Sequence, residues 1–259
     1  MIDPQVIQRG LRTVAIKPRV IVLDTIDSTN SLAKGLLSRA GDEDVIVVAE
    51  SQQSGRGRYN RHWHSPLGGL YMSVAVRPHL EEGNAALLGI LTGCAAVSAI
   101  HEMTKLAARL KWPNDIMLSG LKAGGVLSEF VTMRDNTFGV ILGIGINQNT
   151  SSKDLPTEFR DRATTILTEL GRETSREELA YRIVNEIDRR LAVVYSELSF
   201  SSVLDEWMEL NETIGKTVMV DDGTQIVRGV ATGITSAGSL RVRVGSSEVE
   251  IRAGDVIHM

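Results

Sequence analysis

The chain has 259 residues, with 28 Lys and Arg against 32 Asp and Glu, 42% apolar residues and a single cysteine. This composition is typical of a globular protein, and it excludes a disulfide-rich scaffold because Cys94 has no second cysteine to pair with. A net charge of −4 argues against a general nucleic-acid binder. The N-terminus lacks the pattern of a signal peptide, and no stretch resembles a membrane span. We therefore expect a cytoplasmic protein that makes no membrane contact.

The first half of the chain predicts alternating strands and helices. Residues 19–24 (RVIVLD) predict a buried strand, and Asp27-Ser28-Thr29-Asn30 supplies N-cap side chains for a helix that ends at Gly41. Further strands are expected at 44–49 and 70–76. Residues 84–107 predict a long helix that is buried on most sides, because they are almost uncharged until Glu102. Residues 4–12 are a further short helix candidate.

The second half predicts hairpins followed by two helices. Short strands are expected at 108–111, 116–118, 122–131 and 137–146, with turns at Ser119-Gly120 and Arg134-Asp135-Asn136. A capping box, Ser175-x-x-Glu178, opens a helix with apolar positions at helical spacing as far as Leu198. A shorter helix is expected over 203–210. Together these elements predict an α+β fold with a mixed, largely antiparallel sheet packed by helices.

From Ile214 onward the sequence pattern changes from helical spacing to short strand-like runs. Four short runs, 216–220, 226–231, 240–244 and 249–251, are separated by Gly-containing turns. Leu240, Val242 and Val244 alternate with Arg241 and Arg243, which predicts a strand with one face inward. We therefore predict a small C-terminal β-barrel over 212–259, after a first domain over 1–211.

A positive loop lies between the second and third predicted strands. Residues 51–80 contain four arginines, three histidines and no Asp or Glu. Its centre, Gly55-Arg56-Gly57-Arg58, places two guanidinium groups between glycines that let a ligand approach the backbone. Because guanidinium matches phosphate and carboxylate oxygens, the loop predicts an anion-binding clasp. Taken alone, the motif fits a solvated basic loop or a nucleic-acid contact equally well.

A second cluster comprises Lys111-Trp112-Pro113-Asn114-Asp115 and Lys122-Ala123-Gly124-Gly125. Pro113 holds Trp112 extended and marks a strand end, so Asn114 and Asp115 are expected at a sheet rim. Lys122, beside two glycines, would place a positive charge in a narrow cavity where negative charge can develop. If this cluster stood alone, a tight turn with a surface lysine would be favoured.

Known nucleotide and metal motifs are missing. The run Gly143-Ile144-Gly145-Ile146-Asn147 lacks the third glycine of a dinucleotide fingerprint, and alone it indicates a close-packed strand. The sequence contains neither a P-loop nor an H-E-x-x-H zinc motif. Any bound nucleotide must therefore be held by arginines and by glycine backbone.

Several separated motifs, in order and spacing, resemble those of the biotin protein ligases from about residue 20 to the C-terminus. They are Ser28-Thr29-Asn30, residues 49–58 (AESQQSGRGR), Trp63 with Ser65-Pro66, residues 111–115 (KWPND), residues 122–125 (KAGG) and residues 143–147 (GIGIN). The resemblance implies a catalytic domain similar to class II aminoacyl-tRNA synthetases, followed by a small SH3-like β-barrel. It also implies a two-step, Mg²⁺-dependent reaction in which ATP activates biotin as biotinyl-5′-AMP and a carrier-protein lysine accepts the biotinyl group.

The resemblance also assigns roles to residues of this chain. The catalytic residues are Arg56, Arg58 and Lys122. The implied biotin-binding residues are Ser28, Thr29, Asn30, Gln52, Gly55, Arg56, Gly57, Arg58, Trp63, Lys122 and Gly125. The nucleotide side, a weaker assignment, comprises Arg58, Lys111, Asn114, Asp115 and Asn147. Magnesium is expected on the same side, near Asn114, Asp115 and Asn147, with its ligands unknown. Because acyl-adenylates hydrolyse, residues 51–66 should order over the intermediate and exclude water.

Two departures and three alternatives accompany this interpretation. His64 stands where many members carry an aromatic residue, which weakens the expected apolar cover. Only 27 residues precede Ser28, so we expect ligase activity without operator binding. A carrier domain of a biotin-dependent carboxylase is the implied partner, and the family suggests a homodimer. The alternatives are a lipoate–protein ligase, a non-catalytic biotin-responsive regulator and a basic-loop RNA binder.

Overall fold

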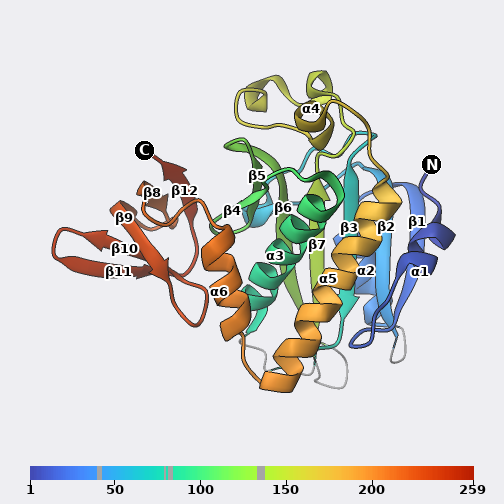
Figure 1. The fold of residues 1–259 in the computed structure, drawn as a ribbon, viewed down its shortest axis with the longest axis horizontal. Coiled ribbons are helices and arrows are strands. Elements are labelled where there is room, and N and C mark those ends of the chain that lie inside the picture. The colour runs from blue at the N-terminus through green and yellow to red at the C-terminus, as the bar shows by residue number, and fades with distance from the viewer. Residues whose placement is uncertain (40–42, 79, 81–83, 133–137) are drawn as a thin grey trace.

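The computed structural model describes residues 1–39, 43–78, 80, 84–132 and 138–259. Its main feature is a seven-stranded sheet (Figure 1). The strand order is β1 (Pro18–Ile26), β2 (Asp44–Gln52), β3 (Leu70–Val76), β7 (Phe138–Ile146), β6 (Leu121–Thr132), β5 (Asp115–Leu118) and β4 (Arg109–Lys111). β1 and β2 pair in parallel, and the other neighbours are antiparallel. The predicted mixed, largely antiparallel sheet is confirmed.

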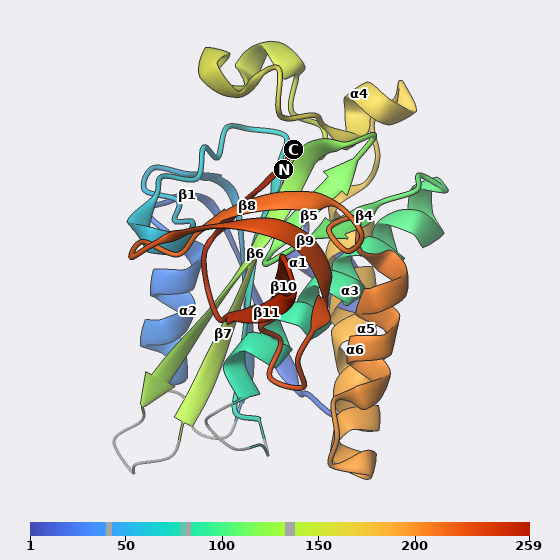
Figure 2. The ribbon, with the colours of Figure 1, turned by 90° about the vertical axis from the view of Figure 1, so that its left-hand side faces the viewer.

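Helices cover both faces of this sheet (Figure 2). α2 (Thr29–Leu37) packs on one face against β2, β3 and β7. The other face carries α1 (Pro4–Gly10), α3 (Ala85–Thr104), α5 (Arg176–Glu197) and α6 (Ser201–Leu210). A short helix, α4 (Ile166–Leu170), lies at the upper end in Figure 1. Among the helices of the described residues, α2 alone packs on its face of the sheet, which leaves room there for a cavity.

α3 is the central helix of the larger core. Contrary to the expectation from sequence, residues Ala86–Thr104 reach the length and mean hydropathy of a membrane span, although 67% of that window is buried inside the protein. The helix packs against α5, α6 and the sheet, so its apolar character is explained by burial in a protein core. Its end differs from the prediction, because Lys105 adopts a left-handed conformation (φ 64°) and stops the helix after Thr104.

Two predicted helix starts are confirmed by their caps. The Ser28 side chain accepts a hydrogen bond from the Ser31 N–H and starts α2, and Ser175 does the same for Glu178 at the start of α5. Leu198, predicted to be on the apolar face of α5, is instead its left-handed C-cap and is 85% exposed. The predicted end of α2 at Gly41 lies outside the described residues.

The hairpins are more numerous than predicted. Ser119 and Gly120 both have positive φ and form the expected two-residue turn between β5 and β6. β6 and β7 pair antiparallel as expected, with their turn outside the described residues. A further hairpin joins β4 to β5 through Trp112–Pro113, a cis peptide bond, and Asn114. Strand 108–111 therefore pairs with its sequence neighbour at the edge of the sheet.

The C-terminal strands form a separate five-stranded antiparallel sheet, called here the β-domain (residues 217–258). Leu240 and Val242 are buried between exposed arginines, as predicted, but Val244 is 40% exposed. A fifth strand, β12, was not predicted. The order is β11 (Ser247–Ile251), β10 (Leu240–Val244), β9 (Ile226–Ile234), β8 (Thr217–Asp221) and β12 (Asp255–His258).

The β-domain rests on the β4–β5 hairpin. The buried Trp112 donates its Nε1–H to the Gly238 carbonyl at 3.0 Å, and its backbone N–H donates to Thr213 Oγ1 at 3.0 Å. The Glu212 N–H donates to the Leu110 carbonyl. These contacts fix the β-domain beside the cavity described next.

Candidate functional site

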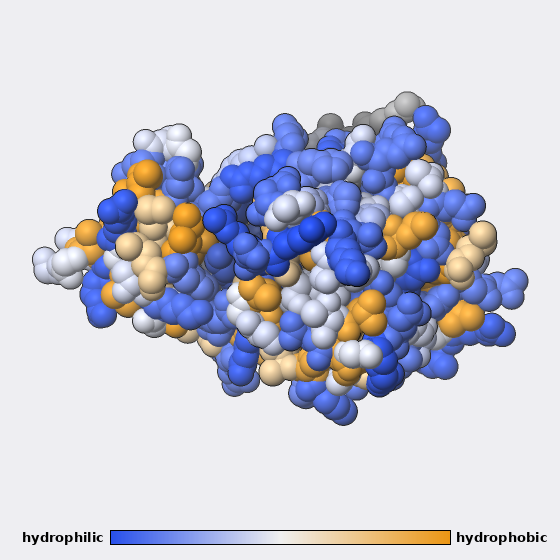
Figure 3. All heavy atoms as spheres, turned by 90° about the horizontal axis from the view of Figure 1, so that it is seen from above, coloured by the Kyte–Doolittle hydropathy of each residue, from blue (hydrophilic) through white to orange (hydrophobic). Residues whose placement is uncertain are grey.

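A cavity of about 620 Å³ opens on the α2 side of the main sheet and reaches the β-domain. Its wall comes from the start of α2, residues 52–64, the β4–β5 hairpin, β6, β7, the segment 155–163 and residues 255–258. Seen from above, the surface at the α4 end of the molecule is mostly hydrophilic, with scattered apolar residues (Figure 3). A cavity with many polar groups on its wall suits a ligand with charged and polar groups.

Two glycines of β7 make the floor of the cavity. A Cβ at Gly143 would lie 2.2 Å from Asn30 Oδ1, and one at Gly145 would lie 2.6 Å from Trp63 Nε1. The alternate residues, Leu142 and Ile144, are buried in the core on the other face of the sheet. The predicted close-packed strand is confirmed, and its glycines let Asn30 and Trp63 lie directly on the backbone.

The predicted long loop is folded as a hairpin, which we call the clasp (residues 52–65). Antiparallel bridges join Gln52 to Ser65 and Arg56 to His62. Tyr59 and Asn60 have φ values of 55° and 57° at its tip. A Cβ at Gly55 would lie 2.5 Å from the Trp63 carbonyl, so a glycine is required for the two sides to approach.

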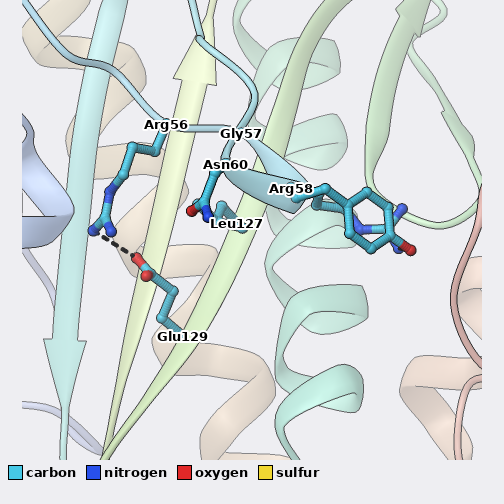
Figure 4. A pocket seen from close by; sticks show the side chains of 7 residues that line it. Arg56, Gly57, Arg58, Asn60, Leu127 and Glu129 are labelled. Atoms are coloured by element: carbon cyan, nitrogen blue, oxygen red, sulfur yellow. Dashed lines mark hydrogen bonds and ion pairs between the residues drawn. The ribbon is translucent and has the colours of Figure 1, made fainter. Parts of the chain in front are cut away.

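Two of the three arginines of the clasp, Arg56 and Arg58, make different contacts. Arg56 Nη2 lies 3.3 Å from Glu129 Oε2 (Figure 4). Arg58 lines the cavity, but its guanidinium donates to the Gly254 carbonyl and the Tyr59 hydroxyl, each at 3.0 Å. Its Cζ lies 4.8 Å from the centre of the Tyr59 ring. Of the two, Arg58 contacts the β-domain directly.

Lys122 of β6 lines the cavity beside Trp63 of the clasp. Its ammonium is ion-paired with Asp115 and lies 5.4 Å from the centre of the Trp63 ring. Its backbone is fixed by the loop before α4, since its N–H donates to the Arg162 carbonyl and its carbonyl accepts from the Thr164 N–H. Within the described part of the chain, the buried Trp63 Nε1, which lies against Gly145, has no hydrogen-bond partner.

Neutral polar groups form the end of the cavity at α2. Gln52 Oε1 accepts from the Thr29 N–H and hydroxyl, at 2.9 and 3.1 Å, and Gln52 Nε2 donates to Ser65 Oγ at 2.9 Å. The hydroxyl oxygen of Ser28 accepts the helix-capping bond, which leaves its proton for a ligand. Both polar ends of the Asn30 side chain already have partners, since Nδ2 donates to Glu129 Oε2 and Oδ1 accepts from the Ser73 hydroxyl. Its side chain is therefore better placed to support this wall than to contact a ligand.

The residues predicted for the nucleotide also line the cavity. Asn114 Nδ2 donates to the Val126 carbonyl at 2.7 Å, and Asn147 Nδ2 donates to the Thr164 carbonyl at 3.1 Å. Lys111 is half-buried at the end of β4. A Cβ at Gly125 would be 3.5 Å from the Asn114 carbonyl, an ordinary contact, so the space beside Gly125 is open to a ligand. The fold brings these predicted residues to one cavity.

Several lining residues were missed from the sequence. They are Leu155 and Phe159 of the loop after β7, and Asp255 and His258 of β12. Glu129 of β6, also missed, lines a smaller pocket of about 190 Å³ that shares Arg56 and Arg58 with the cavity. Asp255 is ion-paired with Arg61 of the clasp. The four-residue strand β12 carries little periodicity, so only the tertiary fold reveals these positions.

His258 is a neutral histidine at the edge of the cavity. Burial and the nearby Lys216 and Lys111 lower its pKa to about 4. Glu212 Oε1 lies 3.8 Å from His258 Nδ1, but Lys216 Nζ is closer, at 3.2 Å. The imidazole therefore accepts a hydrogen bond from an ammonium and carries no charge at neutral pH.

The fold and the cavity define an α+β protein with a polar, arginine-containing ligand site between a helix-covered sheet and a small β-domain. The Biotin/lipoate A/B protein ligase family model matches residues 22–147, and the biotin protein ligase C-terminal domain model matches residues 213–259. The biotin--[acetyl-CoA-carboxylase] ligase of Mycobacterium tuberculosis is 31% identical over 92% of this chain and 89% of its own length. The bifunctional ligase/repressor BirA of Bacillus subtilis is 31% identical over 96% of this chain and 77% of its own length.

Solved structures agree with this relationship. The biotin protein ligase from Aquifex aeolicus in complex with biotin and ATP superposes with a TM-score of 0.81 at 29% identity, covering 93% of this chain and 99% of that one. The chain belongs to the biotin protein ligase family, and the fold class that its motifs predicted is confirmed.

Proposed function

We propose that this ligase binds biotin and ATP together in the cavity, forms biotinyl-5′-AMP and transfers the biotinyl group to a lysine of a carrier domain. The observation that carries the proposal is the presence, around one cavity, of two cations, Arg56 and Lys122, and a neutral polar wall at Thr29 and Gln52. Biotin has a polar, uncharged ring and a carboxylate, so it needs neutral hydrogen-bonding groups for the ring and cations for the carboxylate. Biotin and ATP are ligands of the similar Aquifex structure.

In the first step an oxygen of the biotin carboxylate attacks the α-phosphorus of ATP. The new P–O bond forms as the bond to the β-phosphate oxygen breaks, and pyrophosphate leaves with the electron pair. Both reactants are anions, so Arg56 and Lys122 lower the cost of bringing them together. Arg58, placed at the contact with the β-domain, completes the catalytic set by turning from the Gly254 carbonyl toward the phosphates.

In the second step the amine of the carrier lysine attacks the acyl carbon. The C–N bond forms, the C–O bond to the phosphate breaks, AMP leaves and the amine loses a proton. The partner is a carrier domain of a biotin-dependent carboxylase. A net charge of −4 fits a protein partner better than DNA.

The binding roles divide the cavity into two ends. The polar ring of biotin forms hydrogen bonds with Ser28, Thr29 and Gln52, and Asn30 supports the wall that these residues form. Trp63 covers the apolar part of biotin. The backbone of Gly57 and Gly125 allows close approach of a ligand, whereas Gly55 allows close approach of the Trp63 carbonyl within the clasp. Lys111, Asn114, Asp115 and Asn147 lie on the ATP side, where the amides of Asn114 and Asn147 hold the backbone around it.

Magnesium is expected to come with ATP. Mg²⁺ commonly uses one or two protein carboxylates together with phosphate oxygens and waters. Asp115 offers one carboxylate at the ATP side, and the described residues hold no group of three or more His, Cys, Asp or Glu that would make a separate cage. When bound, the ion would neutralise charge on the phosphates.

The proposal includes three wider features. The chain divides into residues 1–211, which carry the catalytic groups, and residues 212–259; the C-terminal family match over 213–259 supports this division. The protein acts in the cytoplasm, where its buried free Cys94 stays reduced. It forms a homodimer through a sheet face, which sedimentation velocity would test.

The function is tested with purified protein, ATP, Mg²⁺, radiolabelled biotin and an isolated carrier domain. The expected result is biotin-dependent pyrophosphate release and label on the carrier lysine, with no label on a carrier whose lysine is replaced by arginine. Pyrophosphate release driven by lipoate and not by biotin would identify a lipoate ligase instead. Biotin binding without pyrophosphate release would identify a regulator.

A further inference from the structure

A half-buried carboxylate lies beside the clasp, and none of the proposed steps uses it. Glu129 of β6, with 27% of its side chain exposed, lines a smaller pocket of about 190 Å³ that shares Arg56, Arg58 and Leu127 with the cavity. A carboxylate at an anion site is unfavourable unless it is compensated, because like charges repel. Its compensation is visible: Arg56 Nη2 lies 3.3 Å and Asn30 Nδ2 lies 2.5 Å from the same oxygen, Oε2 (Figure 4 shows the Arg56 contact).

From Glu129 a chain of hydrogen bonds runs through the neutral wall. Asn30 Oδ1 lies 2.6 Å from the hydroxyl of Ser73, which is fully buried, and Ser73 lies 2.8 Å from Thr29 Oγ1. The Thr29 backbone N–H then donates to Gln52 Oε1 at 2.9 Å. Gln52 donates to Ser65, and Ser65 donates to the Trp63 carbonyl at 3.1 Å. These hydrogen bonds therefore connect Arg56, on the first strand of the clasp, with Ser65 and Trp63 on its second strand.

The geometry assigns Glu129 as a positioning residue for the biotin site: it holds Arg56 toward the cavity and links it to the wall at Thr29 and Gln52. This inference rests on the proposed function. An arginine side chain has many rotamers, and fixing it before the ligand binds removes an entropic cost from binding. Glu129 is also the charged acceptor at one end of the hydrogen-bond chain, so its charge orients the donors of both Asn30 and Arg56.

Position 143 must be glycine for this arrangement. A Cβ there would overlap Asn30, which lies between Ser73 and Glu129. Gly143 therefore leaves the space in which Asn30 can bond to both Ser73 and Glu129.

The test compares binding of biotin with binding of biotinol, which has an alcohol in place of the acid. In Glu129→Gln, Arg56 loses its anionic partner, so the dissociation constant for biotin is expected to rise about tenfold. The constant for biotinol is expected to change less than twofold, since it has no carboxylate for Arg56. Glu129→Asp, which keeps the charge, should recover part of the biotin affinity.

Two further measurements make the result specific. In an Arg56→Ala background, Glu129→Gln should add less than a twofold change, because its partner is gone. Glu102→Gln is the matched control, since Glu102 also lies 3.3 Å from an arginine, Arg182, but outside the cavity. Its biotin affinity should equal that of the wild type.

Unchanged or tighter biotin binding by Glu129→Gln would overturn the inference, since Glu129 would then merely repel the ligand. Equal losses for biotin and biotinol would also overturn it, because they would indicate a general structural defect. A wild-type protein that binds no biotin would contradict the proposed function itself, which separates the two failures.

Discussion

The ammonium of Lys122 lies 5.4 Å from the centre of the Trp63 indole ring. The cation that is proposed to meet the reacting charge and the aromatic ring that is proposed to cover biotin therefore share one wall. Gly145 makes this possible, because the indole lies directly on its backbone. The relationship joins three segments, the clasp, β6 and β7, in one contact.

Gly145→Ala should weaken biotin binding about tenfold or more. The added Cβ would lie 2.6 Å from Trp63 Nε1, so the indole must move and its cover of the apolar part of biotin is reduced. Isothermal titration calorimetry with biotin measures the effect. Gly233→Ala, where no atom lies within 4 Å of the new Cβ, is the control. Equal affinity of both variants would show that Trp63 does not cover the ligand.

Arg190→Met should destabilise the protein by about 3–5 kcal/mol, because it removes a buried cation that pairs with two partly buried carboxylates and leaves Glu206 without that partner. The Arg190 side chain is 3% exposed and joins α5 to α6 and α3 through Glu186, Glu206 and Ser98. Urea unfolding measures the change. Arg189→Met is the matched control, since Arg189 also pairs with Glu186 but is 59% exposed, and its effect should stay within about 1 kcal/mol.

The stability should depend on pH through His258. Its pKa is about 4 in the folded protein against an ordinary 6.5, so between these values the unfolded chain binds a proton that the folded protein does not. The free energy of unfolding should therefore fall as the pH falls from 6.5 to 4. Lys216→Met removes a nearby ammonium and should raise the pKa of His258, as followed by NMR titration of the imidazole. An unchanged titration would contradict this electrostatic explanation.

The sequence predicted the elements well where periodicity or caps are strong. β3, the start of α5 at Ser175 and the turn at Ser119-Gly120 all follow from local patterns. Leu198 was predicted on the apolar face of α5 because it is apolar and falls at the helical spacing. Nothing in the neighbouring sequence indicates its left-handed conformation. β12 is too short to show periodicity.

The site was predictable as a set of motifs, but its internal contacts were not. Asn30 was expected to contact biotin, whereas both polar ends of its side chain are used by Ser73 and Glu129. Arg58 was expected beside Arg56, yet it contacts Gly254, nearly 200 residues away along the chain. The Asn30 contacts depend on how α2 packs on β3 and β6, and the Arg58 contact depends on the packing of the β-domain. Local sequence encodes neither.

The clasp should become protected when the ligands bind. Arg61 is exposed in the clasp, and Tyr59 beside it is 55% exposed. Limited trypsin digestion should cleave after the clasp arginines in the empty protein and should slow at least severalfold with biotin and ATP, because the clasp then covers the intermediate. Mass spectrometry identifies the cleaved bonds. Equal cleavage in both states would contradict closure of the clasp.

Biotin-dependent exchange of labelled pyrophosphate into ATP tests most directly whether Arg56 and Lys122 bring the two anions together. The account predicts that Arg56→Ala and Lys122→Ala each slow this exchange about 10²–10³-fold. Lys34→Ala, which removes an exposed cation from α2, should exchange at the wild-type rate. Wild-type exchange by both cavity variants would contradict the account.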